Sequence, residues 1–166
     1  MTPHLAQLNV AVPVGPRTDP RMAGFYADLD RINAVADGWP GFVWRLVDDA
    51  GADATSLRPF GGDLMVNMSV WVSLEALREY TFRSGHLDVL RRRREWFVPL
   101  GAPHAVMWWV PAGHIPTVEE AKDRLALLRQ HGPSPAAFTF RKPFPPPDAE
   151  TDVESAVDAA FCEWAT

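Results

Sequence analysis

The sequence predicts a single α+β domain with ferredoxin-like β-α-β-β-α-β connectivity and an antiparallel sheet. Four short runs of aliphatic and aromatic residues have the pattern of strands. Between the first and second of them, and again between the third and fourth, apolar residues recur at helical spacing. The chain has 166 residues, of which 47% are hydrophobic, and this suits one sizeable core better than two.

The charge and the cysteine content exclude several classes of function. A formal net charge of -5 gives no extended basic surface, so we expect no nucleic-acid partner and no membrane partner. The single cysteine, Cys162, can form neither an internal disulfide nor a cysteine-based zinc site. The chain has no basic signal region and no apolar run near the roughly 18 residues that a membrane span needs. These features predict a cytoplasmic protein.

The first half of the chain predicts two strands separated by a helix. Residues 4 to 12 alternate between aliphatic and polar side chains, as a strand does. Asp19 followed by Pro20 is a typical helix start, and Gly38 ends that helix. Residues 41 to 48 form a second strand, and the polar stretch that follows is expected to be a long turn.

The next segment predicts a strand, an interrupted helix and another strand. Residues 64 to 72 form the third strand, and Ser73 caps the helix that follows it. The helix is expected to break near Gly85, to resume at His86 and to run through an arginine-rich stretch. Residues 105 to 110 form the fourth strand.

The C-terminal third adds helices to this core. Thr117 and Glu120 match a capping box that opens a helix to about residue 130. Residues 137 to 140 could pair as an edge strand. We expect the domain to span residues 1 to 142, and residues 143 to 166 to form a proline-rich linker and an amphipathic helix that packs on the body or on a partner.

Strand parity sorts the side chains into two faces of the sheet. One face, called here the aliphatic face, carries Leu8, Val10, Val66, Met68, Val70 and Val72. The other, called the mixed face, carries Gln7, Asn9, Asn67, Ser69 and Trp71. The second strand adds either Arg45 or Trp44 to the mixed face, and the fourth adds Trp108 or Trp109.

The two faces differ enough to predict where a ligand binds. We expect the helices to cover the aliphatic face and a second copy of the chain to cover the mixed face. Such a homodimer would enclose a cavity with a few polar groups, which is the usual form of a small-molecule site.

Four segments carry a resemblance to a known family: HLAQLNVAVP, DPRMAGFYADLDRINAVADGWPGFVWRL, VNMSVWVSLEALREYTFRSGHLDVLRRRREWF and MWWVPAGHIPTVEEAKDRL. They resemble a bacterial family of unannotated function within the dimeric alpha–beta barrel superfamily, over residues 4 to about 142. That superfamily includes cofactor-free antibiotic-biosynthesis monooxygenases and heme-degrading monooxygenases. The resemblance therefore implies a ferredoxin-like fold, a dimeric barrel and a monooxygenase-like activity.

The heme-degrading members supply one possible set of site residues. Their site resembles an Asn on the first strand, a Trp near the end of the third strand and a His on the next helix, where this chain has Asn9, Trp71 and His86. In that reading His86 is the proximal iron ligand, Trp71 presses on the macrocycle, and Asn9 donates a hydrogen bond on the distal side.

Each of these residues also has a structural interpretation. His86 follows Gly85 at a helix break, where an imidazole caps backbone groups as readily as it binds a ligand. The arginines at 91 to 94 span all sides of a helix, so they form a solvated face unless Arg91 or Arg94 anchors a substrate carboxylate or phosphate. The tryptophans Trp44, Trp71, Trp96, Trp108 and Trp109 either pack in the core or line the pocket of a flat aromatic ligand.

Two functions remain in competition at this point. The first is an oxygenase-like enzyme on an aromatic or polyketide-like small molecule, with His86 as base and with either no cofactor or heme. In it Asn67, Ser69, Arg45, Trp44, Trp109, Arg91 and Arg94 would contact the substrate. The second is a non-catalytic protein that binds or senses a small molecule or heme.

Overall fold

A five-stranded antiparallel sheet forms the centre of the protein. The computed structural model describes residues 2–147. Strand β1 (His4–Pro13) lies between β3 (Met65–Trp71) and β5 (Ala105–Val110), and β2 (Phe42–Arg45) pairs with the outer edge of β3. The order β2-β3-β1-β5 is that of a ferredoxin-like sheet and confirms the predicted fold class. A two-residue strand that was not predicted, β4 (Phe97–Val98), pairs with the end of β1.

The helices begin where the sequence places their caps. A 3-10 turn (Pro20–Met22) leads into α1 (Ala23–Asp37), and Asp19 accepts a hydrogen bond from the Arg21 amide at its start. The helix after β3 is broken at Gly85 into α2 (Leu74–Arg83) and α3 (His86–Trp96), as expected.

Helix α4 (Val118–His131) follows β5 and starts at the predicted cap. The Thr117 hydroxyl accepts from the Glu120 amide at 3.1 Å. The Glu120 carboxylate does not complete a capping box, because it accepts hydrogen bonds from the side chains of Trp108 and His114 instead. None of the helices among the described residues is long and apolar enough to span a membrane.

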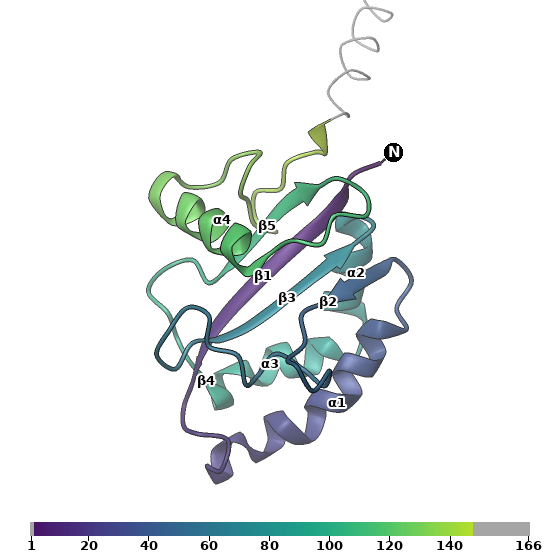
Figure 1. Cartoon of the computed structure of the whole chain (residues 1–166). Coiled ribbons are helices and arrows are strands. Elements are labelled where there is room, and N and C mark those ends of the chain that lie inside the picture. Colours follow the sequence, from purple (N-terminus) through teal and green to yellow (C-terminus); the bar gives the residue numbers. More distant parts are fainter. Residues whose placement is uncertain (1, 148–166) are drawn as a thin grey trace, which may run out of the picture.

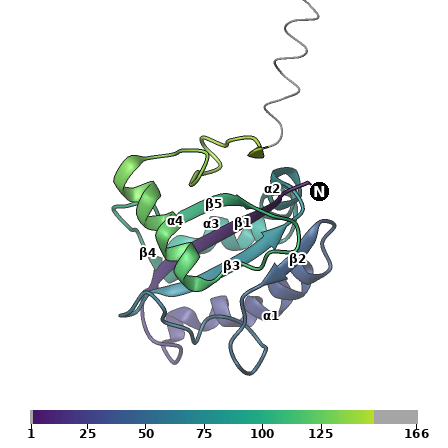
Figure 2. The same cartoon turned by 45° about the horizontal axis from the view of Figure 1, so that its top comes forward.

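The helices lie on both sides of the sheet. Figure 1 shows α1, α2 and α3 on one side and α4 on the other, and the turned view in Figure 2 keeps this arrangement. The sequence analysis expected all helices on one side. It is wrong here, because α4 has an apolar stripe of its own, formed by Ala121, Leu125 and Leu128, which must be buried.

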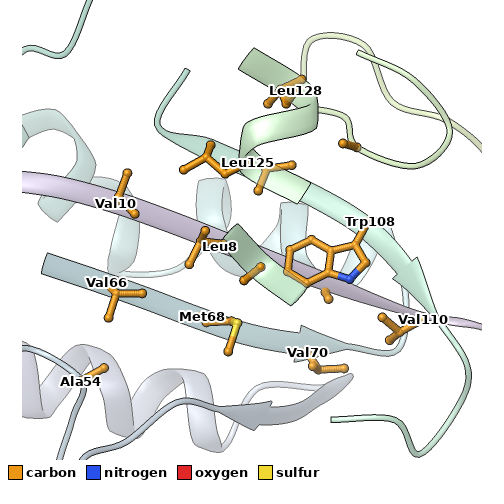
Figure 3. Packing of buried hydrophobic residues seen from close by; sticks show 14 residues of the cluster. Leu8, Val10, Ala54, Val66, Met68, Val70, Trp108, Val110, Leu125 and Leu128 are labelled. Atoms are coloured by element: carbon orange, nitrogen blue, oxygen red, sulfur yellow. The ribbon is translucent and has the colours of Figure 1, made fainter. Parts of the chain in front are cut away.

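Helix α4 covers the aliphatic face. Trp108 of β5 and Leu125 and Leu128 of α4 pack against Leu8 and Met68 of the central strands (Figure 3). Each of these side chains is at most 2% exposed. The turn between β2 and β3 closes the rest of that face, with Ala54 buried and Leu57, Phe60 and Leu64 packed around it. One chain therefore buries its aliphatic face by itself, except for Val72, which lies just beyond the end of β3 and is 42% exposed.

The mixed face lies against α1, α2 and α3. This corrects the expectation that a second subunit covers it, because Asn9, Asn67 and Trp71 line space that is also lined by residues of these helices. The alternating pattern of the strands separated the two faces correctly. A helix, α4, covers the aliphatic face as expected, but the mixed face is covered by the other three helices of the same chain and not by a second copy. Homodimerisation stays a prediction, and the cavity does not depend on it.

The segment after α4 returns to the sheet. Phe138 and Met107 of β5 exchange two backbone hydrogen bonds, so the edge strand expected at residues 137 to 140 is reduced to a single bridge. The expected amphipathic helix lies outside the described residues, as does all of the chain from residue 148.

Candidate functional site

A cavity separates the mixed face of the sheet from α1, α2 and α3. It consists of two adjoining chambers of about 160 Å³ and about 320 Å³. The smaller chamber reaches Phe25 and Phe97, and the larger one reaches Trp71 and His104. Both are lined by the same central group: Asn9, Asn33, Arg45, Asn67, Tyr80, His86, Leu90 and Arg93. We call the two chambers together the interlayer cavity.

Three carboxamides line the interlayer cavity. Asn9 and Asn67 lie directly opposite each other on β1 and β3, and Asn33 comes from α1. Within residues 2–147 none of the three side chains forms a hydrogen bond, and Oδ1 of Asn9 is buried without a partner. Asn67 is exposed although β3 is an inner strand, because the cavity opens above it. A buried amide oxygen without a partner costs about 1–3 kcal/mol, so a ligand that donates a hydrogen bond would offset a real penalty.

His86 presents a free nitrogen in this setting. Its Nδ1 lies 3.4 Å from the carbonyl oxygen of Thr81, and a carbonyl can only accept, so Nδ1 carries the proton in this contact. Nε2 then keeps its lone pair, and no described residue bonds to it. Burial lowers the pKa of His86, and the Thr81 carbonyl offsets this only in part. The side chain is therefore a neutral imidazole at pH 7, in the state that a general base requires.

An aromatic stack forms the wall beside His86. The Tyr80 ring stacks on Trp71 with centroids 4.9 Å apart, and it also contacts His86 at 5.0 Å and Trp39 edge-on at 6.0 Å. The Tyr80 hydroxyl donates to the Ile32 carbonyl at 3.4 Å, and burial raises the pKa of this phenol, so it stays protonated. Trp71 is only 1% exposed and donates from Nε1 to the Ser69 hydroxyl at 2.8 Å. Trp71 thus supports the wall, whereas Tyr80 lines both chambers.

Arg93 and His104 lie at the end of the larger chamber. Arg93 donates from its guanidinium to Nε2 of His104 at 3.0 Å. Burial lowers the pKa of His104, and the charges of Arg93 and Arg129 lower it further. The Arg93 guanidinium therefore faces the cavity beside a neutral histidine.

Arg45 lines both chambers but is already paired. Its guanidinium binds both carboxylate oxygens of Asp37, at 2.7 Å and 3.2 Å, and donates to the Ala52 carbonyl at 2.9 Å. The open choice on β2 is settled by register: Arg45 lies opposite Ser69 on the mixed face, and Trp44 packs in the core on the aliphatic side. Arg45 therefore fixes the turn after β2 more than it offers donors to a ligand.

Four residues predicted to contact substrate do not line the interlayer cavity. Trp44 belongs to the opposite side of the sheet, and Trp109 lies on the cavity side but packs with Phe138 and donates to the Phe144 carbonyl at 2.9 Å. Arg91 and Arg94 are exposed on the outer side of α3, where Arg91 pairs with Asp88 at 3.7 Å. Helical phase brings Arg93 to the cavity in their place.

Several cavity residues were not singled out from the sequence. Asn33 and Tyr80 are polar or amphipathic residues within otherwise regular helices, and His104 stands directly before β5 with no pattern around it. One signal in the sequence could have marked α1 as cavity-lining. Asn33 is a polar residue directly after the buried Ile32, on the apolar side of the helix.

Heme does not fit in the manner that the resemblance implies. Trp71 has no free ring surface for a macrocycle, because Tyr80 stacks on it and Phe42 meets it edge-on at 5.3 Å. Tyr80 also occupies the space beside His86, where the proximal side of a heme would lie. Among the described residues no group of three His, Cys, Asp or Glu side chains could hold a metal ion.

These features define a ferredoxin-like α+β protein with a polar and aromatic cavity between its sheet and one helical layer. The chain belongs to the family described as Domain of unknown function (DUF3291), whose profile matches residues 4–155. This confirms the resemblance to a family of unannotated function. No curated protein matches the chain.

Two solved structures are similar to it. SnoaB, a cofactor-independent oxygenase from Streptomyces nogalater, is 19% identical and aligns over 68% of this chain and 96% of its own, with a TM-score of 0.44. The NE2512 protein of unknown function from Nitrosomonas europaea is 11% identical and aligns over 70% of this chain and 97% of its own, with a TM-score of 0.47.

Proposed function

We propose that the protein is a cofactor-independent monooxygenase that oxidises an aromatic small molecule in the interlayer cavity. The observation that carries this proposal is the neutral His86, whose Nε2 has no partner among the described residues and lies in a cavity walled by Tyr80 and lined by three free carboxamides. This arrangement supplies a base, a flat wall and hydrogen-bonding groups for an enolate or phenolate oxygen.

The chemistry begins with a proton transfer. His86 Nε2 takes a proton from an acidic C–H or O–H of the substrate, and the amide N–H groups of Asn9 and Asn67 stabilise the oxygen on which the charge develops. The electron-rich anion then gives one electron to O₂, and the two radicals combine to form a carbon-bound peroxide. The protonated His86 returns its proton to that peroxide.

Loss of water completes the reaction. His86 takes the remaining proton from the same carbon, the O–O bond breaks, and the departing hydroxide leaves as water. One methylene and one O₂ thereby give one carbonyl and one water, so atoms and electrons balance without an external reductant. Phe25, Leu29 and Phe97 give the smaller chamber an apolar wall against which the ring of the substrate can pack.

Anthrone tests the proposal, because its central methylene becomes acidic by enolisation and its oxidation product, anthraquinone, is easily quantified. We expect the protein to accelerate oxygen uptake over the buffer background and to consume one O₂ for each anthraquinone formed. Oxygen uptake at the background rate, with anthrone bound, would overturn the proposal and would favour the non-catalytic binding function.

The pH profile provides a second expected result. A base must be unprotonated in the free enzyme, so kcat/KM should fall as the pH drops through the pKa of His86 and stay level above it. Because burial lowers that pKa from 6.5, the acid limb should have its midpoint below 6.5. The measurement is kcat/KM for anthrone from about pH 5 to pH 8, and a midpoint above 7 would contradict the assignment of His86 as the base.

A further inference from the structure

The end of the interlayer cavity near His104 lies close to positive charge from two helices, α3 and α4. Arg93 on α3 donates to His104 at 3.0 Å, and Arg129 on α4 donates to the carbonyl of the neighbouring Pro103 at 2.9 Å. His104 itself is held at the start of β5, because its carbonyl accepts from the Val10 amide at 2.8 Å. The sheet therefore fixes the position about which the two arginines converge.

No carboxylate neutralises this end. Two other arginines of α3 are paired, Arg92 at 3.0 Å from Glu95 and Arg91 at 3.7 Å from Asp88, whereas Arg94 forms no salt bridge within residues 2–147. In the described part of the chain neither Arg93 nor Arg129 forms a salt bridge. Burial is the main cause of the lowered pKa of His104, and the charges of Arg93 and Arg129 lower it further.

The donors are arranged so that an anion can reach them. Arg93 lines both chambers and His104 lines the larger one, so a group within the cavity meets both. Since Nε2 of His104 accepts from Arg93, the imidazole carries its proton on Nδ1 and has one donor left. The N–H groups of the Arg93 guanidinium that do not bond to His104 form a fork that suits a planar, two-oxygen acceptor.

We propose that this end of the cavity binds a carboxylate carried by the aromatic ligand, with Arg93 as its direct partner and with Arg129, which does not line the cavity, contributing only its charge from nearby. The proposal rests on the proposed function for the location of the ring, and it adds a preference among ligands: an aromatic acid binds more tightly than the neutral compound with the same ring. The carboxylate lies toward Arg93 while the ring lies along Tyr80, which orients the reacting carbon relative to His86.

The test compares salicylate with salicylamide, which has the same ring and hydroxyl but no charge. Isothermal titration calorimetry at low salt should show salicylate binding about tenfold more tightly to the full chain, as expected for charge-assisted hydrogen bonds. Arg93→Gln should abolish the preference, and Arg129→Gln should reduce it. Arg94→Gln is the matched control, because Arg94 is exposed on the same helix and does not line the cavity, and it should keep the full preference.

Three results would overturn the proposal: equal affinity of the wild-type protein for both compounds, no measurable salicylate binding, or an unchanged preference in both Arg93→Gln and Arg129→Gln. The outcome is independent of catalysis. If the protein fails to oxidise anthrone but keeps an arginine-dependent preference for salicylate, the proposed function fails and the acid-binding site stands.

Discussion

Replacing His86 with Ala is expected to lower kcat/KM for anthrone oxidation by at least about 100-fold, the lower bound for loss of a positioned general base. The fold should survive, because His86 is only half-buried, its side-chain hydrogen bond to the Thr81 carbonyl is 3.4 Å long, and Tyr80 keeps its stack on Trp71 when the His86 ring is removed. The measurement is initial oxygen uptake, with circular dichroism and a thermal melt of the same preparation.

Replacement of a histidine outside the cavity provides the matched control. His131 is exposed at the end of α4 and does not line the interlayer cavity, so His131→Ala should leave the rate unchanged. Full activity of His86→Ala, or equal losses in the two variants, would remove His86 from the mechanism while leaving the cavity as a binding site.

The second prediction is a large loss of stability when a buried side chain is removed from the core on the aliphatic face. Leu125 is 1% exposed in the core that α4 forms with the sheet, so Leu125→Ala should lower the free energy of unfolding by about 2–5 kcal/mol. Leu127 lies two residues away on the same helix and is only partly buried, so Leu127→Ala removes the same atoms and should cost less than half as much.

Urea unfolding of the two leucine variants checks this directly. A small loss for Leu125→Ala, comparable to that of Leu127→Ala, would show that α4 does not close this face in solution. In that case the face would be available to a second copy of the chain, as the sequence analysis expected for the mixed face.

Local signals in the sequence predicted the elements well. The caps at Ser73 and Thr117, the break at Gly85 and the alternation in β1 and β3 each depend on neighbouring residues only. For this reason four strands and four helices were placed within a few residues of their positions, whereas β4 was missed because two residues at the end of a helix leave no periodic pattern.

The sequence predicted part of the site, and there is a physical reason why it did not predict the rest. Parity placed Asn9, Asn67, Ser69 and Trp71 on one face, and the structure brings them into one cavity with His86. The alternation of side chains along a strand does not show which helices cover each face of the sheet. That depends on α4 packing on the aliphatic face, which brings together residues far apart in the sequence. The choice of Arg93 over Arg91 and Arg94 likewise depends on how α3 is rotated against the sheet, which four consecutive arginines do not reveal.

A crystal structure of the protein with anthraquinone, the product of the expected reaction, tests the central claim most directly. We expect the planar ring between the mixed face and α1 to α3 of one chain, with its edge beside Nε2 of His86 and a carbonyl oxygen near the amide of Asn9. A ring bound on the α4 side, or held between two chains with the interlayer cavity vacant, would contradict the assignment of this cavity as the functional site.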